Sequence, residues 1–193
     1  SYRGTVIING GTVNAVSHGN GAAIGTGSGV GDAWSGSVTI NGGTVYAIND
    51  GKKGSAAIGT GSGNYPNDVT KGNIAVSITG GTVYARVETD SGTAYKGSAI
   101  GTCATPNIPD DMEHPFVCGF TTGSDGNAVV FIEDSYVSEY DEDEWHGIVF
   151  LGGEGIIYGS EVEVQESFTI STGETLTIGE NKTLAVAEGV TVT

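Results

Sequence analysis

The chain has 193 residues, of which 34 are glycine and four are proline, and its formal net charge at pH 7 is −16. The length is typical of one domain, and the lack of a Gly-x-y period together with the scarcity of proline excludes collagen. The negative charge repels phosphate groups, and no run of about 18 apolar residues occurs, so we expect neither nucleic acid binding nor membrane insertion.

Two short motifs recur along the chain in a fixed order. The first places two strand-like segments around a Gly-Gly-Thr turn, and its copies lie at Val6–Val13, Val38–Val45 and Val76–Val83. The second is built around Ile-Gly-Thr, and its copies lie at residues 21–27, 54–61 and 97–102. Because the second motif follows the first each time, both belong to one repeating unit.

Alternation within each unit predicts short strands. Val38 and Ile40 point to one side and Thr39 to the other, as in a strand with one buried face. A unit of this kind without helical periodicity is typical of a β-helix, because its strands pair with those of the next coil. We therefore expect an all-β fold, a right-handed single-stranded parallel β-helix with loop insertions. Antiparallel hairpins that turn at Asn9-Gly10 are the alternative.

Equivalent side chains of successive coils are expected to stack on one another. Asn9 and Asn41 occupy one corner position, with Thr79 in the third copy, and a strand spacing of about 4.8 Å allows a polar ladder there. Tyr46 and Tyr84 share an outward position, and their stacking would stabilise the adjacent strands. Both sets of residues are thus interpreted as structural.

The chain departs from this repeat after its first half. Residues 1–102 hold the three Gly-rich repeats, and residues 103–127 form an insertion with both cysteines and three of the four prolines. A degenerate fourth repeat is expected over residues 128–160, with Val130 aligned on Val76 of the third copy. The insertion is interpreted as a loop added to the β-helix.

Residues 161–193 have a shorter period. Strand-like triplets recur every eight residues, at 168–170, 176–178 and 184–186. Three such sides make a coil of about 24 residues, and Val190–Val192 begins another. Because the pattern runs to both ends without polar caps, we expect either a fragment of a larger protein or end-to-end self-association. Residues 1–193 are interpreted as one β-helix domain.

The repeats resemble those of large bacterial adhesin-like surface proteins. The resemblance rests on Ile-x-Gly-Gly-Thr-Val, on Gly-x-Ala-Ile-Gly-Thr-Gly and on the series that begins at Gly173, and it covers most of the chain outside residues 103–145. It implies a protein that is secreted or displayed at a bacterial cell surface. A related carbohydrate-binding β-helix family holds calcium through a Gly-Asp-Gly-Ile-Asp motif. Here Ala23-Ile24 and Ala57-Ile58 stand in that stretch without the aspartates.

Two residue sets are candidates for a disulfide and a metal site. Cys103 and Cys118 lie near each other in a turn-rich segment, which favours a structural disulfide in an exported protein over a free or reactive pair. Asp141 and Asp143 lie in an acidic run whose oxygens suit calcium. The alternative for this run is a solvated acidic loop. No other cofactor is predicted.

Five aromatic residues in or near the variable loops are candidate ligand-binding side chains. An aromatic ring packs on the C–H face of a sugar while polar neighbours fix the hydroxyl groups. The candidates are Trp34, Tyr65, Tyr95, Tyr140 and Trp145. We expect a non-enzymatic, adhesin-like binding segment whose partner is a glycan or another host or cell-surface ligand. A passive stalk or a self-stacking filament subunit is the alternative.

A polysaccharide-degrading enzyme is a further alternative, because parallel β-helices host many of them, but fold alone carries no function. A lyase needs cationic groups near an acidic substrate, and the two arginines, Arg3 and Arg86, are far apart in the repeat pattern. A hydrolase needs two carboxylates on one face, whereas alternation sends Glu133 and Asp134 to opposite faces. We therefore expect no enzyme activity and name no catalytic residue.

Overall fold

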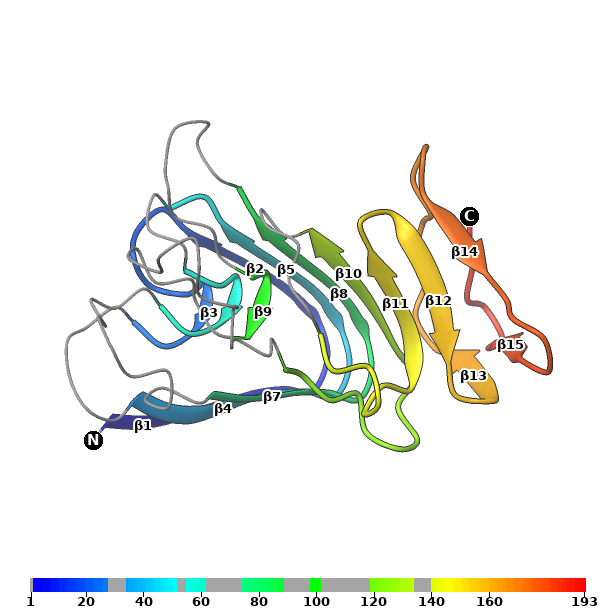
Figure 1. Ribbon diagram of the computed structural model, residues 1–193, viewed down its shortest axis with the longest axis horizontal. Coiled ribbons are helices and arrows are strands. Elements are labelled where there is room, and N and C mark those ends of the chain that lie inside the picture. The colour runs from blue at the N-terminus through cyan, green and yellow to red at the C-terminus, as the bar shows by residue number, and fades with distance from the viewer. Residues whose placement is uncertain are drawn as a thin grey trace, which may run out of the picture.

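The computed structural model describes residues 2–27, 34–51, 55–61, 74–88, 98–101, 119–133 and 140–193. These residues form strands β1–β15 in four sheets and no helix, so the predicted all-β class is confirmed for them (Figure 1). No helix in this part of the chain is long and apolar enough to cross a membrane.

The first three repeats lie one beside the next, and each contributes one strand to each of three sheets. The first sheet contains β1 (Tyr2–Ile8), β4 (Trp34–Ile40) and β7 (Ile74–Ile78). The long sheet contains β2 (Thr12–Ser17), β5 (Thr44–Asn49) and β8 (Thr82–Val87). The short sheet contains β3 (Ile24–Gly25), β6 (Ile58–Gly59) and β9 (Ile100–Gly101). All pairs among these strands are parallel.

The register of these sheets aligns the repeated motifs residue for residue. Val38 lies opposite Val6 and Val76, so parallel stacking is confirmed and a hairpin at Asn9-Gly10 is wrong. The polar corner ladder is also present, because the Asn41 amide donates to Asn9 Oδ1 at 2.8 Å and the Thr79 hydroxyl donates to Asn41 Oδ1 at 3.0 Å. Each corner therefore holds the next one in register.

Glycines of the second motif allow the short sheet to form. The backbone φ angles are 138° at Gly25, 140° at Gly59 and 113° at Gly101, which L side chains rarely adopt. A Cβ added at Gly59 would lie 1.9 Å from the carbonyl oxygen of Gly101. The Ala-Ile-Gly-Thr segments thus need glycine for both conformation and close approach.

The inward residues of the three repeats form the first core. Alternation buries Val38, Ile40, Val45 and Ala47 completely, and the same positions in the third repeat are also buried. Burial of each valine or isoleucine side chain contributes roughly 1.5–3 kcal/mol. The pattern of apolar residues at every second position therefore accounts for the fold of the described residues up to Gly101.

The fourth repeat begins in a different register from the predicted one. Strand β10 (Ala128–Glu133) belongs to the long sheet, with Val129 opposite Thr82 and Val130 opposite Val83. The place opposite Ser77 in the first sheet is taken by Thr121. Aligning Val130 on Val76 was therefore wrong, because an apolar alternating strand fits either place in a repeat and the insertion hides the spacing.

The long sheet continues beyond β10 through a hairpin. Strand β11 (Gly147–Leu151) is parallel to β10 after a much shorter interval than separates the earlier repeats, so residues 128–160 do not form one repeat. Strand β12 (Glu154–Tyr158) then pairs antiparallel with β11 across Gly152 and Gly153, whose φ angles are 59° and 87°. Two such residues make a tight hairpin turn. The expectation of parallel pairing throughout is therefore wrong at this point.

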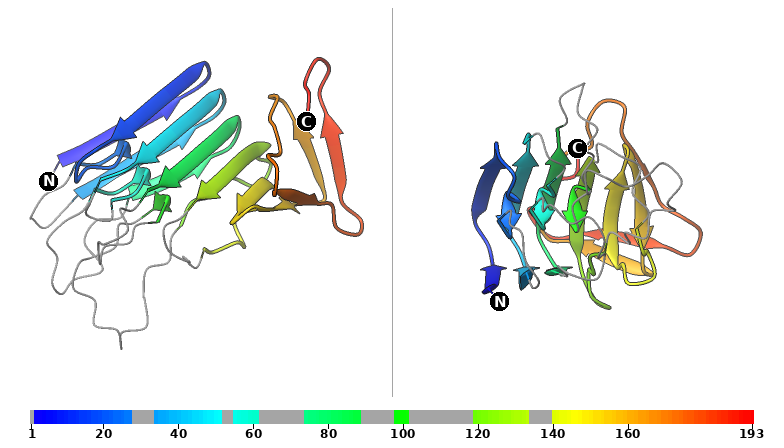
Figure 2. Two further views of the ribbon diagram at one scale, coloured as in Figure 1. Left: turned by 90° about the horizontal axis from the view of Figure 1, so that it is seen from above. Right: turned by 60° about the vertical axis from the view of Figure 1, so that its left-hand side comes forward.

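Residues 154–193, the C-terminal unit, form short three-sided coils. Strand β14 (Thr175–Thr177) is parallel to β12, and β15 (Thr183–Val186) is parallel to β13 (Glu161–Val164). On the third side Phe168 pairs with Val192 of the next coil, so the predicted period of three eight-residue sides is confirmed. Figure 2 shows this unit, in orange to red, at the far end of the stacked strands.

The C-terminal unit covers the face of the long sheet that points away from the first core. Val130 and Val149 point into the first core, whereas their neighbours Val129 and Ile148 point the other way into a second core. The C-terminal unit contributes Val162, Val164 and Phe168 to this second core. Strands β10 and β11 are thus buried on both faces, which explains their continuous apolar runs.

We predict that Gly59→Ala lowers the free energy of unfolding by about 3 kcal/mol or more, because the new Cβ meets the Gly101 carbonyl in a strained backbone conformation. Gly19→Ala is the matched control, since a Cβ at Gly19 has no atom within 4 Å. Urea denaturation of both variants measures the difference. Equal midpoints for the two would show that close backbone contact in the short sheet does not limit stability.

Candidate ligand-binding surface

A row of stacked rings crosses the outer face of the long sheet. Tyr46 stacks on Tyr84 with ring centroids 4.8 Å apart, Tyr84 stacks on Phe131 at 4.6 Å, and Phe131 stacks on Phe150 at 4.3 Å. The interplanar angles are 6°, 11° and 9°. The predicted Tyr46–Tyr84 stack is therefore confirmed, and the register extends it across two further strands.

One end of this aromatic row is closed by the C-terminal unit. Phe131 and Phe150 are 5% and 1% exposed. Phe168 meets both rings edge to face, with centroids 6.0 and 6.2 Å away. Edge-to-face contacts of this kind are favourable beyond the burial of apolar area. The closed end therefore fixes the row and the C-terminal unit together.

The other end of the row is open. Tyr46 is 38% exposed, and its neighbour in register on β2 is Asn14, which is exposed and is not aromatic. Since Tyr84 covers one face of the Tyr46 ring, the free face looks over Asn14. Thr12 and Val16 flank Asn14, and alternation places them on the same side of β2. We call Thr12, Asn14, Val16 and Tyr46 the Tyr46 site.

Carboxylates of the C-terminal unit lie beside the aromatic row. Glu166 reaches the corner of the second repeat, where the backbone N–H of Gly43 donates to its Oε1 at 2.6 Å. Burial raises the pKa of Tyr84, with further contributions from Tyr46 and the charge of Glu174, while a hydrogen bond from the Thr169 backbone lowers it. Glu166 and Glu174 therefore contribute negative charge to the surroundings of the aromatic row.

The cation on the same face is already paired. Arg86 follows Tyr84 on the outward side of β8, and its guanidinium lies 2.9 Å from a Glu88 oxygen and 3.3 Å from a Glu133 oxygen. Exposed ion pairs of this kind contribute little to stability. The two carboxylates place negative charge beside the Arg86 guanidinium and so weaken its attraction for an acidic ligand.

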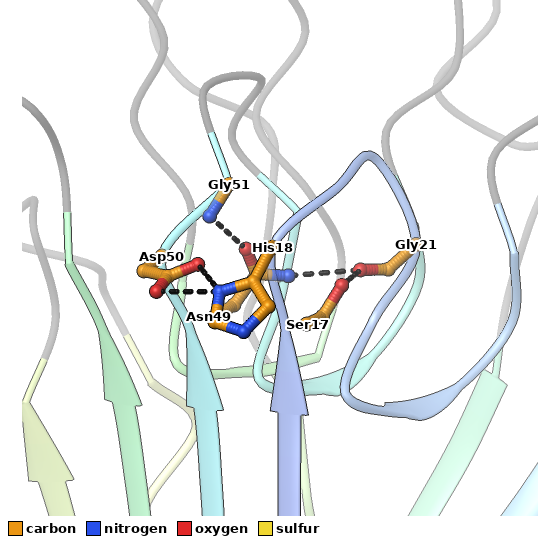
Figure 3. Close-up of polar contacts among 6 residues, drawn as sticks. All are labelled: Ser17, His18, Gly21, Asn49, Asp50 and Gly51. Carbon is orange, nitrogen blue, oxygen red and sulfur yellow. Dashed lines mark hydrogen bonds and ion pairs between the residues drawn. The ribbon is translucent and has the colours of Figure 1, made fainter.

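A polar network lies where β2 and β5 end (Figure 3). Buried Asn49 donates to the carbonyl oxygens of Gly21 at 2.9 Å and Ala56 at 3.1 Å, and accepts from the Gly51 N–H at 2.9 Å. His18 Nδ1 lies 2.7 Å from Asp50, with its own side chain 78% exposed. The inward position of Asn49 could have been read from alternation. Its three hydrogen bonds make it a structural residue of the corner.

Trp145 is buried, whereas the sequence-based interpretation placed it in a loop as a candidate ligand-binding residue. It is only 6% exposed, and its indole N–H donates to the carbonyl oxygen of Phe120 at 3.0 Å. Its ring packs on Phe120 at 4.9 Å and edge to face on Tyr158 at 5.1 Å. The residue closes the end of the first core, because no complete repeat follows β10 in the described chain to cover it.

The other aromatic candidates have different outcomes. Tyr140 is half-buried and packs against Phe120 and Trp145, with centroids 6.0 and 5.8 Å away, so it also belongs to the cap of the first core. Trp34 begins β4, but its side chain lies outside the described residues. Tyr65, Tyr95 and both cysteines, Cys103 and Cys118, lie outside them as well.

The acidic run forms a turn. Asp141 and Asp143 are exposed, and the backbone N–H of Asp143 donates to Asp141 Oδ1 at 3.2 Å. In the part of the chain that the structure describes, no three His, Cys, Asp or Glu side chains are grouped so that they could hold a metal ion. Calcium binding by these two residues stays a prediction.

Comparison with known proteins bears on the first two repeats. A family model described as Beta helix repeat matches residues 6–28 and 38–62, which include strands β1–β3 and β4–β6 in large part. No curated protein and no solved structure matches the chain. The match agrees with the parallel register of these strands, and residues 6–28 and 38–62 are similar to beta-helix repeats.

We predict that Tyr158 makes stability depend on alkaline pH. Burial raises the pKa of Tyr158 first, followed by its hydrogen bond to Glu142, which is 2.9 Å long, and the charge of that carboxylate. The folded protein keeps this proton above a pH of about 10, where unfolded tyrosine loses it, so the free energy of unfolding falls as pH rises.

Tyr158→Phe should show a shallower fall than the parent between about pH 10 and 12, because the variant has no phenol to titrate at this position. Urea denaturation at several pH values measures both slopes. Identical slopes would mean that Tyr158 titrates as it does in the unfolded chain.

Proposed function

We propose that the chain is a non-catalytic, glycan-binding segment of a bacterial protein, a right-handed β-helix that is secreted or displayed at the cell surface. The observation that carries the proposal is the exposed ring of Tyr46 at the open end of the aromatic row. Sugars pack their C–H faces on such rings. Localisation rests on the resemblance of the repeats to those of bacterial surface proteins.

The chemistry of the Tyr46 site favours a sugar over an apolar ligand or a protein. An exposed ring with an amide from Asn14 and a hydroxyl from Thr12 matches a ligand that has one C–H face and a rim of hydroxyl groups. A stable protein partner covers about 800 Å² on each side. The Tyr46 site offers one ring and three neighbouring side chains, which suits a single saccharide.

Catalysis is not part of the proposal. The carboxylates beside the aromatic row are engaged by backbone N–H groups, since Gly43 donates to Glu166 and Ser171 donates to Glu174, both at 2.6 Å. A general acid or base must instead reach a proton of the substrate. These two side chains therefore support a structural role at the edge of the site.

We predict that Tyr46→Ala lowers glycan affinity about 10-fold, the loss expected for removing one aromatic contact. Tyr46→Phe keeps the ring and should stay within about 3-fold of the parent. A glycan array followed by calorimetry with the glycan that binds measures both affinities. Circular dichroism controls for folding.

Tyr65→Ala and Tyr95→Ala test the loop tyrosines singled out in the sequence. If these variants abolish binding while Tyr46→Ala retains it, the ligand site lies in the loops and the assignment to Tyr46 is wrong.

A second candidate function, self-association, is favoured by the outermost layer of the C-terminal unit. Within the described chain, β14 and β15 pair along one edge only. Val186 is 45% exposed although it lies opposite Val164, which is fully buried, and Ile178 is 52% exposed. Unpaired strands with apolar side chains recruit further strands. This layer fits a second copy of the chain.

For this candidate we predict that the sedimentation coefficient of the parent rises with protein concentration, whereas Val186→Lys remains a monomer because a charge in the layer opposes pairing. Ile156→Lys is the matched control, since Ile156 is 46% exposed on a strand paired along both edges. A parent that stays monomeric at every concentration would contradict self-association.

A further inference from the structure

The aromatic row stops one strand short of the edge of the long sheet. Rings occupy the same register position on β5, β8, β10 and β11, and the next position, on β2, is Asn14. Neighbouring strands are about 4.8 Å apart, which matches the spacing of the stacked rings. A ring-shaped ligand stacked on the free face of Tyr46 would therefore lie directly over Asn14.

We propose that the Tyr46 site takes one neutral hexopyranose in this position and that Asn14 selects it. This inference rests on the proposed function. The Asn14 amide has one acceptor oxygen and two N–H donors, so it can pair with two adjacent hydroxyl groups of the sugar. Tyr46 binds the C–H face of any sugar that presents one, whereas the hydrogen bonds of Asn14 select sugars by the positions of their hydroxyl groups.

The size of the site limits the ligand to one ring. Thr12 and Val16 lie two residues before and after Asn14, and both point to the same face of β2. Residues two apart in a strand are separated by about 6.6 Å, so Thr12 and Val16 lie about 13 Å from each other and their side chains leave room for one pyranose over Asn14. Val16, which is 52% exposed, offers apolar contact on one side, and the Thr12 hydroxyl offers a polar contact on the other.

Charge makes the preferred sugar a neutral one. The Glu166 carboxylate holds the adjacent corner at Gly43, and the negative charge of Glu174 contributes to the raised pKa of Tyr84. Arg86 is paired with Glu88 and Glu133. With a net charge of −16, the chain repels uronates, sialylated glycans and sulfated glycans.

Two substitutions of Asn14 test this inference. Asn14→Ala should lose about 10-fold in affinity, because the hydrogen bonds from the Asn14 amide to the sugar hydroxyls are lost. The same variant should bind glucose- and galactose-terminated glycans equally. Asn14→Tyr should abolish binding, since its ring takes the place of the sugar next to Tyr46. The same substitution should leave the melting temperature equal or higher by extending the row, which separates loss of binding from loss of folding.

The probes are neutral hexose oligosaccharides and their sialylated and sulfated forms, tested with the purified chain on one array. If Tyr46→Ala loses binding while Asn14→Tyr binds as the parent does, the proposed function stands and the role of Asn14 is wrong. Tighter binding of the sialylated or sulfated forms than of the neutral ones would also overturn the inference. A parent chain that binds none of the probes would contradict both proposals.

Discussion

The packing of the C-terminal unit on the long sheet, and the candidate binding site, both depend on the stacking of four rings: Tyr46, Tyr84, Phe131 and Phe150. In-register parallel pairing places these rings one strand apart, so the backbone that forms the repeats also builds the row. At its closed end the row presents Phe131 and Phe150 to Phe168, and this contact holds the C-terminal unit on the long sheet. At its open end it leaves the face of Tyr46 available. One end of the aromatic row thus anchors the C-terminal unit, and the other end is the candidate binding site.

Sequence reasoning could predict the parts of the fold that local pattern determines. The Gly-Gly-Thr copies predicted the parallel register and the Asn9–Asn41 ladder, and the eight-residue period predicted the coil that joins Phe168 to Val192. The change of direction after β11 could not be predicted in the same way. In sequence, the Gly152-Gly153 pair that forms a hairpin turn cannot be distinguished from the Gly-Gly pairs that form the corners of the repeats. A signal for the second core was present nonetheless: the apolar run of β10 lacks the alternation of a strand with one buried face.

For the candidate site, too, some residues could be identified from the sequence and others could not. Trp145 looked exposed because it follows an acidic run, yet it fills the end of the first core, and that role depends on how the chain continues after β10. Tyr46 was interpreted as structural because its partner Tyr84 was visible in the repeats. That Asn14 leaves one face of Tyr46 uncovered could have been read by aligning the first two repeats. The carboxylates Glu166 and Glu174 could not have been placed, because they reach the row only after the C-terminal unit folds onto the long sheet.

The central claim is that the free face of Tyr46 is the place where a ligand meets this protein. The measurement that tests it most directly is an NMR titration of the isotope-labelled chain with a neutral glycan, following the Tyr46 ring, the Asn14 side-chain amide and the Trp145 indole N–H. The account predicts large shifts at Tyr46 and Asn14, caused by the sugar stacked on the Tyr46 ring above Asn14, and no change at buried Trp145. Saturable shifts at Trp145 or in the loops, with Tyr46 and Asn14 unchanged, would contradict it.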